Sequence, residues 1–359
     1  MATTQDYINQ LKTDKQTLKT NLIDKGVEVL DTDTFTEMST KVADITGNDI
    51  TDFMEIETAP QYYIENIYPN TGLLSILKEI PAIKWTGKYT NSSGYNYSLS
   101  NYFLGAKNLR IIDISNFENI DKVESMSMMF YDCEKLEEVI NINKQDYTSL
   151  KYIKEIFNRC ISLKNVNNFF QKINNNTIVQ CSGMCSDCWS LTGTITIPKN
   201  FFNSQSSGVN LIQIFFRCKN CKKIEILSPV VVYGILYAFK DCSNVEEIDI
   251  ECVDFSKISG THPSSVEGMF DNCTKLVNLK FGTNLGAGYT ASANNTFAKL
   301  KLSTCIALSH DSLMDVINKL YDLTANGKNN QQLILGETNI AKLTEEEIAI
   351  ATNKGWKVS

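Results

Sequence analysis

The most constraining feature of the sequence is a spacing of residues, Phe-x-x-Cys-x-x-Leu-x-x-Val, that recurs along most of the chain. It is clearest between residues 123 and 142, where Phe130, Cys133, Leu136 and Val139 fill the four positions. The first position of successive copies falls at residues 103, 130, 157, 185, 215, 239 and 270. Periods of about 20–50 residues are typical of repeat proteins, whose units stack to share one core.

Each copy is expected to contribute a short helix and a short strand to that core. Apolar residues three and four apart, up to the Cys position, predict the helix, and the apolar positions that follow the Leu predict the strand. The predicted fold is therefore an α/β solenoid. Its predicted core residues are Phe103, Leu109, Phe130, Cys133, Leu136, Phe157, Cys160, Leu163, Cys188, Leu191, Phe215, Cys218, Phe239, Cys242, Val245, Phe270, Cys273 and Leu276.

Two copies, S-M-S-M-M-F-Y-D-C-E-K-L-E-E-V and S-V-E-G-M-F-D-N-C-T-K-L-V-N-L, carry a resemblance to the BspA-like leucine-rich repeats. The resemblance covers roughly residues 74–281, and the copies that begin at Leu74 and Cys185 depart from the pattern. It implies a leucine-rich-repeat solenoid and a role in surface recognition. The family has no shared catalytic residues to transfer to this chain.

Composition and charge exclude several classes of function. The chain has 359 residues, 43% of them hydrophobic, with a formal net charge of -7. An acidic protein without a basic stripe is a poor candidate for binding nucleic acid, which requires clustered Lys and Arg. The first residues do not follow the pattern of a secretory signal, and no stretch is apolar enough to span a membrane. We therefore expect a protein that is neither exported through a signal peptide nor membrane-anchored.

The first 48 residues predict two helices. The first, over residues 4–25, places four apolar residues on a heptad seam, which favours a parallel oligomer. These seam residues are Ile8, Leu11, Leu18 and Leu22. The alternative is a helical hairpin that packs its own apolar stripes together. This segment also resembles the amino-terminal attachment segments of phage tail, baseplate and head-fibre proteins.

Four regions follow from these patterns. Residues 1–48 form the helical attachment and oligomerisation segment, and 49–102 form a linker and amino-terminal cap with a degenerate first repeat. Residues 103–282 are the repeats, and 283–359 form a small α/β cap. In that cap we predict a helix over 308–323 begun by Ser309, a strand over 332–335, and a helix begun by the capping box of Thr344 and Glu347.

Reactive residues are few, and most have a simpler explanation. Cys181, Cys185, Cys188, Cys218 and Cys221 have a spacing compatible with zinc. The repeat already accounts for four of them, because small buried positions suit a reduced cysteine. A cysteine nucleophile needs a base, and the two histidines, His262 and His310, are expected to be solvated. We predict no enzyme activity, no metal and no cofactor.

The sequence therefore predicts a phage virion protein that recognises the host surface from the tail or baseplate. Its amino-terminal helices would bind other virion proteins and assemble a homotrimer. Its repeats would bind a glycan or protein on the host cell. Two alternatives remain, namely a capsid decoration or head-fibre protein, and a bacterial BspA-like adhesin.

Overall fold

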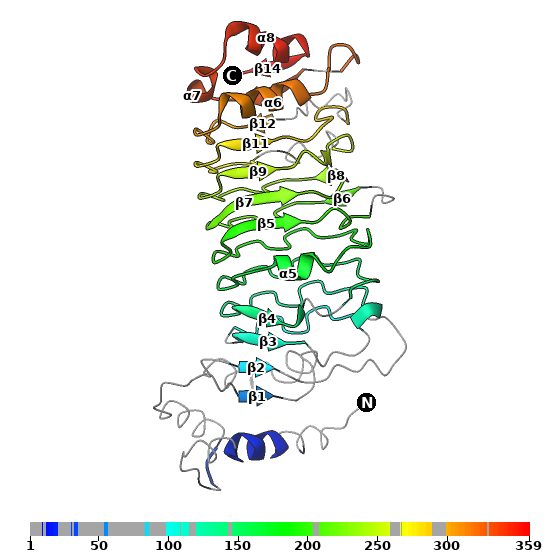
Figure 1. Cartoon of the computed structure of the whole chain (residues 1–359), viewed down its shortest axis with the longest axis vertical. Coiled ribbons are helices and arrows are strands. Elements are labelled where there is room, and N and C mark those ends of the chain that lie inside the picture. Colours follow the sequence, from blue (N-terminus) through cyan, green and yellow to red (C-terminus); the bar gives the residue numbers. More distant parts are fainter. Residues whose placement is uncertain are drawn as a thin grey trace.

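A computed structural model shows the chain as an elongated stack of turns, with the helical residues 12–20 near one end and the C-terminus near the other (Figure 1). The structure describes residues 9, 12–20, 30, 32–34, 54–56, 83–85, 98–107, 109–114, 120–142, 146–203, 208–258, 266, 268–288, 299–328 and 330–359. None of the helices described in these ranges is long and apolar enough to cross a membrane.

Parallel strands run up one side of the stack in two four-stranded sheets. The lower sheet has the order β1-β2-β3-β4 and the upper sheet the order β11-β9-β7-β5. The strands are β1 (Met54–Ile56), β2 (Ile83–Trp85), β3 (Ile111–Asp113), β4 (Glu138–Ile140), β5 (Gly193–Ile197), β7 (Cys221–Ile226), β9 (Glu247–Asp249) and β11 (Asn278–Lys280). Between the two sheets lies the short helix α5 (Asn167–Phe170).

Further parallel strands form two three-stranded sheets, of order β10-β8-β6 and β12-β13-β14. They are β6 (Val209–Asn210), β8 (Val230–Gly234), β10 (Val253–Asp254), β12 (Lys299–Lys301), β13 (Gln331–Ile334) and β14 (Trp356–Val358). The repeat pattern predicts one strand per unit, so the first of these sheets was not anticipated. The parallel pairing itself is expected when successive units repeat the same conformation.

The core of the stack is built from columns of identical positions. All eighteen residues predicted for the repeat core are buried. At the first position, the Phe rings of consecutive repeats stack almost in parallel. Ring centroids are 5.6 Å apart for Phe103 and Phe130, 5.4 Å for Phe130 and Phe157, and 5.6 Å for Phe239 and Phe270. Cys185 occupies the same position between Phe157 and Phe215.

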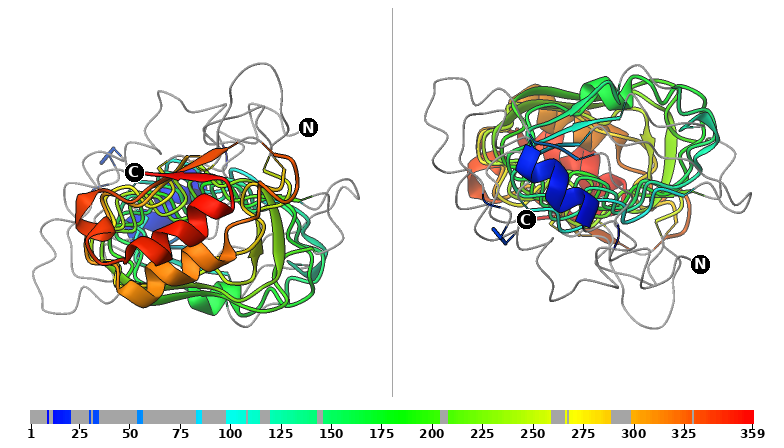
Figure 2. Two further views of the ribbon diagram at one scale, coloured as in Figure 1. Left: turned by 90° about the horizontal axis from the view of Figure 1, so that it is seen from above. Right: turned by 90° about the horizontal axis from the view of Figure 1, so that it is seen from below.

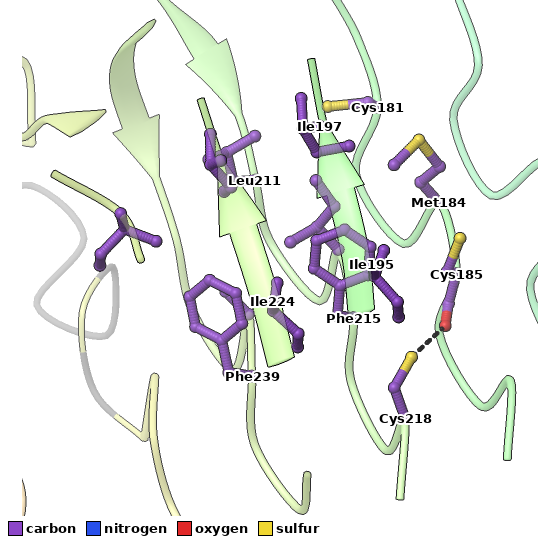
Figure 3. Close-up of a cluster of buried hydrophobic side chains, with 14 of the residues drawn as sticks. Cys181, Met184, Cys185, Ile195, Ile197, Leu211, Phe215, Cys218, Ile224 and Phe239 are labelled. Atoms are coloured by element: carbon purple, nitrogen blue, oxygen red, sulfur yellow. Dashed lines mark hydrogen bonds between the residues drawn. The ribbon is translucent and has the colours of Figure 1, made fainter. Parts of the chain in front are cut away.

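The cysteines form a second column with a specific hydrogen bond. Each thiol donates to the carbonyl oxygen of the first-position residue in the preceding repeat, at 3.0–3.2 Å. Figure 3 shows one such bond, from Cys218 to the carbonyl of Cys185, among the buried side chains around Phe215 and Phe239. The column therefore favours a small side chain, and a thiol at this position also donates one hydrogen bond.

The predicted helix of each repeat is absent from the described repeats, where the segment is a run of tight turns. In residues 126–133, alternate backbone N–H groups donate to carbonyls of the next repeat at 2.8–2.9 Å, and the intervening ones donate within their own turn. In these turns a backbone N–H donates to the carbonyl three residues earlier, so residues at this spacing are buried just as they would be on one face of a helix. The expectation of one short helix per repeat is therefore wrong, although its buried positions are right.

This backbone places two residues of each repeat at positive φ. One lies two residues before the Phe position, and the other lies two residues after it. Their φ values lie between 54° and 74°. The residues are Asn101, Met128, Glu155, Gly183, Gln213, Tyr237 and Gly268, and Gly105, Asp132, Arg159, Asp187, Arg217, Asp241 and Asn272. At Gly268 a Cβ atom would lie 2.5 Å from Cε1 of Tyr237, so only glycine accommodates the neighbouring tyrosine.

A further repeat follows the last one that the sequence pattern identified. The thiol of Cys305 donates to the carbonyl of Phe270 at 3.2 Å, as the other column cysteines do. Leu302 and Leu308, which are buried, take the first and Leu positions. The repeats thus extend into the region assigned to the cap. One repeat further along the chain, the buried side chain of Asn339 donates to the carbonyl of Leu302 at 3.0 Å, in the place where the other repeats have a cysteine thiol.

The carboxy-terminal end is covered by α6 (His310–Lys319), α7 (Glu337–Ile340) and α8 (Glu345–Asn353). Ser309 caps α6, and the predicted capping box of Thr344 and Glu347 is present. Helix α6 lies beside β11, where the next strand of the upper four-stranded sheet would lie. Its Ser312 and Asp315 side chains accept hydrogen bonds from the backbone N–H groups of Leu279 (2.8 Å) and Phe281 (2.7 Å) in and beside β11. Figure 2 shows α6 and α8 lying across this end of the molecule.

At the other end, residues 12–20 are helical and lie below β1 (Figures 1 and 2). Leu18, one of the four predicted seam residues, is 5% exposed in the single chain. The other three, Ile8, Leu11 and Leu22, lie outside the described residues, as do residues 35–48. The parallel oligomer and the helical hairpin both stay predictions.

The two columns predict different costs for Phe157→Ala and Cys160→Ala. Phe157→Ala removes a buried ring that stacks on Phe130, so the free energy of unfolding should fall by about 3–5 kcal/mol. Cys160→Ala removes one hydrogen bond and one sulfur atom, at a cost of about 1–2 kcal/mol. Ala106 already fills this position in another repeat. Urea unfolding of the full chain, followed by circular dichroism, measures both. Equal losses would contradict the column description.

Candidate ligand-binding surface

The repeat fixes which side chains point away from the core. Cys188 and Leu191, at the Cys and Leu positions, are fully buried. The residue directly after the Cys position is therefore turned outward in every repeat. In most repeats this residue is polar or aliphatic, but in one it is Trp189, which is 39% exposed. A large aromatic ring at a position that the core does not need is the strongest sign of a binding role on this chain.

Three neighbours hold Trp189 in place. Its indole Nε1 donates to Oδ1 of Asp187 at 3.2 Å. The ammonium of Lys219, from the next repeat, lies 4.5 Å from the ring centroid. The side chain of Asn220 donates through Nδ2 to the Trp189 carbonyl at 2.8 Å. The ring is thus exposed and also pre-positioned on a rigid part of the fold.

Charges of alternating sign surround the ring. Arg217 lies 3.5 Å from Asp187 and 3.6 Å from Asp241, measured between side-chain nitrogen and oxygen atoms. The Arg217 guanidinium also lies 4.7 Å from the ring centroid of Phe216. We call Asp187, Trp189, Arg217, Lys219 and Asn220 the Trp189 surface. It combines an aromatic face with hydrogen-bond donors and acceptors at its edge.

The alternation extends beyond this surface, down the second positive-φ position. Asp132, Arg159, Asp187, Arg217 and Asp241 follow one another in successive repeats. Arg159 pairs with Asp132 at 3.0 Å. Such half-exposed pairs contribute little stability individually. Their main effect is to leave this side of the stack close to neutral in the stretch that carries Trp189.

The cysteines that suggested a zinc site act as hydrogen-bond donors. Cys188, Cys218 and Cys221 donate to backbone carbonyls at 3.0–3.1 Å. Burial raises the pKa of Cys181 and Cys185 well above the usual range. A metal ligand or nucleophile must be a thiolate, so this environment disfavours both roles. Within the described ranges, no three or more Cys, His, Asp or Glu side chains form a group that could hold a metal ion.

His310, the one histidine within the described residues, links two helices of the cap. Its Nε2 lies 2.8 Å from Oε1 of Glu347, and Asp311 lies beside its Nδ1. The hydrogen bond to Glu347 raises the pKa of the imidazole. Both of these partners are acidic residues in the first turn of a helix. Its role is to tie α6 to α8.

Trp189 was not among the candidate residues predicted from the sequence. The repeat frame selects buried positions, and Trp189 lies one residue outside them. The available signal was a tryptophan at a position where the other repeats carry Lys107, Glu134, Ile161, Lys219, Ser243, Thr274 and Ile306. A comparison of the outward positions, column by column, would have found it.

Comparisons with known proteins place the similarity in the repeats. A family described as "Mycoplasma protein of unknown function, DUF285" matches residues 95–200, which include the repeats that begin at residues 103, 130 and 157 and the start of the next. A leucine-rich cell surface protein from Faecalibacterium prausnitzii A2-165 is 14% identical, over 78% of each chain, with a TM-score of 0.27. So low a score establishes no shared fold, and the fold described above rests on the strand register and burial. No curated protein matches the chain significantly.

Thiol reactivity tests the placement of the cysteines. Ten of the eleven are buried, and Cys252 alone is exposed. Burial raises the pKa of Cys305 to about 12, so little reactive thiolate is expected from such residues at neutral pH. A thiol reagent such as DTNB should therefore titrate one thiol per native chain and eleven after denaturation. Cys252→Ser should remove the rapid reaction; rapid reaction of further thiols would contradict the structure.

The His310 pair predicts a pH dependence in the cap. The pKa of His310 in the folded protein lies above its ordinary value of 6.5. The pair with Glu347 therefore stabilises the fold fully below that ordinary value, and this stabilisation is lost as pH rises through the folded pKa of His310. NMR titration should show the His310 signal, which His262→Gln identifies, titrating above the ordinary value of 6.5. Glu347→Gln keeps an oxygen for the capping box and should lower the pKa of His310 toward its ordinary value, with Asp311 still raising it. An unchanged pKa would exclude the pair.

Proposed function

We propose that this chain is a non-enzymatic recognition protein that uses a BspA-like leucine-rich-repeat solenoid to present a binding surface to a cell. The observation that carries the proposal is Trp189, an exposed tryptophan held by Asp187 and Lys219 on a stack of regular turns. Binding energy at interfaces concentrates in a few such anchors, with Trp and Arg enriched among them. Here a residue of each type, Trp189 and Arg217, contacts the same side chain, Asp187.

The rigidity of the scaffold supports this role. Hydrogen bonds join successive repeats, and the Phe and Cys columns, including Cys185, are buried. A surface built on such elements loses little conformational entropy when it binds. Sequence changes at outward positions leave the core columns untouched, so a stack like this tolerates different binding surfaces.

We further propose that the recognition takes place on a phage virion, at the tail or baseplate. The support is the resemblance of residues 1–48 to phage attachment segments. In this proposal the amino-terminal segment joins other virion proteins and forms a homotrimer. Several copies of a weak site on one particle would then bind a cell surface with high avidity. No nucleic acid, membrane, metal or cofactor is part of the proposal.

Immunogold labelling with antibodies to the full chain tests the location. Phage particles from a lysate of the producing strain should carry gold at the distal tail. Gold over the head would indicate a decoration or head-fibre protein. Labelled bacterial surfaces beside unlabelled particles would exclude the virion and indicate an adhesin.

Substitution of Trp189 tests the recognition role. In the full chain, Trp189→Ala should lower the apparent affinity for cells by about tenfold or more, because it removes the anchor side chain. Ile306→Ala is the matched control, since Ile306 occupies the same outward position in another repeat and is 51% exposed. It should leave binding unchanged. Equal effects of the two substitutions, at equal thermal stability, would contradict the proposal.

A further inference from the structure

We infer that the Trp189 surface binds an uncharged saccharide, with a sugar ring lying on the indole in the place now held by the Lys219 ammonium. This inference rests on the proposed recognition role and names the chemistry of its ligand. Three properties of the surface lead to it: the isolation of the aromatic ring, the polar groups at its edge, and the balance of charge.

The ring stands alone among polar neighbours. The other large apolar side chains that are exposed in the described part of the chain are Leu30, Tyr152, Tyr233, Val277, Ile306 and Ile350. Of these, only Tyr233 lies in the two repeats that carry the Trp189 surface, and it belongs to β8, a strand of a different sheet from β7, which directly follows Asn220. The centre of a protein interface is a larger apolar patch, with charged residues depleted. A single flat ring instead fits a ligand whose own apolar face is no larger than one ring, such as a sugar.

The edge of the ring offers both kinds of hydrogen-bonding group. Asp187 only accepts, and Arg217 only donates, with five N–H groups. Asn220 does both, and its Oδ1 accepts from Asn244 at 3.3 Å. Sugar hydroxyls also donate and accept, so a hydroxyl-bearing ring on the indole would find partners of both types around it.

The charges favour a neutral ligand over an ionic one. Asp187 and Asp241 lie on either side of Arg217 and balance it together with Lys219. Only Lys219 lies over the ring, at 4.5 Å. A cation over an exposed aromatic ring is held weakly, and its flexible side chain can move aside. A sugar can therefore take its place without leaving a buried charge unpaired.

Variants at two positions distinguish this ligand from others. Trp189→Phe keeps a flat ring and should stay within a few fold of the native affinity for cells, whereas Trp189→Leu keeps bulk without a ring and should lose about tenfold. Lys219→Ala removes the group that the sugar displaces, so affinity should hold or rise. A fall in affinity with Lys219→Ala would indicate an anionic ligand and overturn the inference. Equal binding by the Phe and Leu variants would also overturn it.

Treatment of the cells identifies the class of ligand directly. Periodate, which cleaves sugar diols, should abolish the Trp189-dependent binding of the full chain, and proteinase K should leave it intact. The reverse result would indicate a protein receptor. Binding that depends on Trp189 but resists periodate would overturn the saccharide and leave the recognition role standing.

A second assay covers the case in which no cells are bound, which would contradict the recognition role itself. The full chain is applied to a printed array of neutral hexasaccharides of glucose, galactose and N-acetylglucosamine. Binding that Trp189→Leu removes and Ile306→Ala retains would support the saccharide. Absence of Trp189-dependent binding in both assays would overturn it.

Discussion

Hydrogen bonds between the backbones of successive turns are the interaction on which the rest of the structure depends. From the repeat that begins at Phe103 to the one that begins at Phe239, alternate N–H groups donate to the next repeat, and the others donate within their own repeat. Every buried backbone group must find a partner, and this arrangement supplies partners without a helix. It also fixes the spacing between turns, so rings and thiols from neighbouring repeats meet in register. The backbone hydrogen bonds therefore set the spacing of the buried columns, and the outward side chains of successive repeats have the same spacing.

The buried columns could be predicted from the sequence because burial repeats with the same period in every unit. The local conformation could not. Spacings of three and four suit a helix and a chain of three-residue turns equally well. The residue types at positive φ gave little warning, because Met128, Glu155 and Arg159 are neither glycine nor asparagine. The repeat at Cys305 was missed because Leu302 replaces the usual Phe and a true helix follows closely.

The repeat pattern could not predict the Trp189 surface, for a different reason. Core positions are constrained by packing in every repeat, whereas outward positions vary freely, and a single tryptophan among them breaks no rule. What distinguishes Trp189 is its contacts with Asp187 and Lys219, which lie in two different repeats. Residues thirty apart in sequence become neighbours only after the turn length is known. The charge alternation from Asp132 to Asp241 depends on the same register.

The hydrogen bonds of Ser312 and Asp315 to the edge of β11 have a consequence for how copies can be crowded together. A parallel sheet that ends in free N–H groups is a template on which another polypeptide can polymerise. Here two side chains of a helix occupy these groups, and Ser312 also donates to the carbonyl of Val277 at 3.0 Å. This edge of the sheet therefore has no free N–H groups at Leu279 and Phe281 with which a strand of a neighbouring copy could pair.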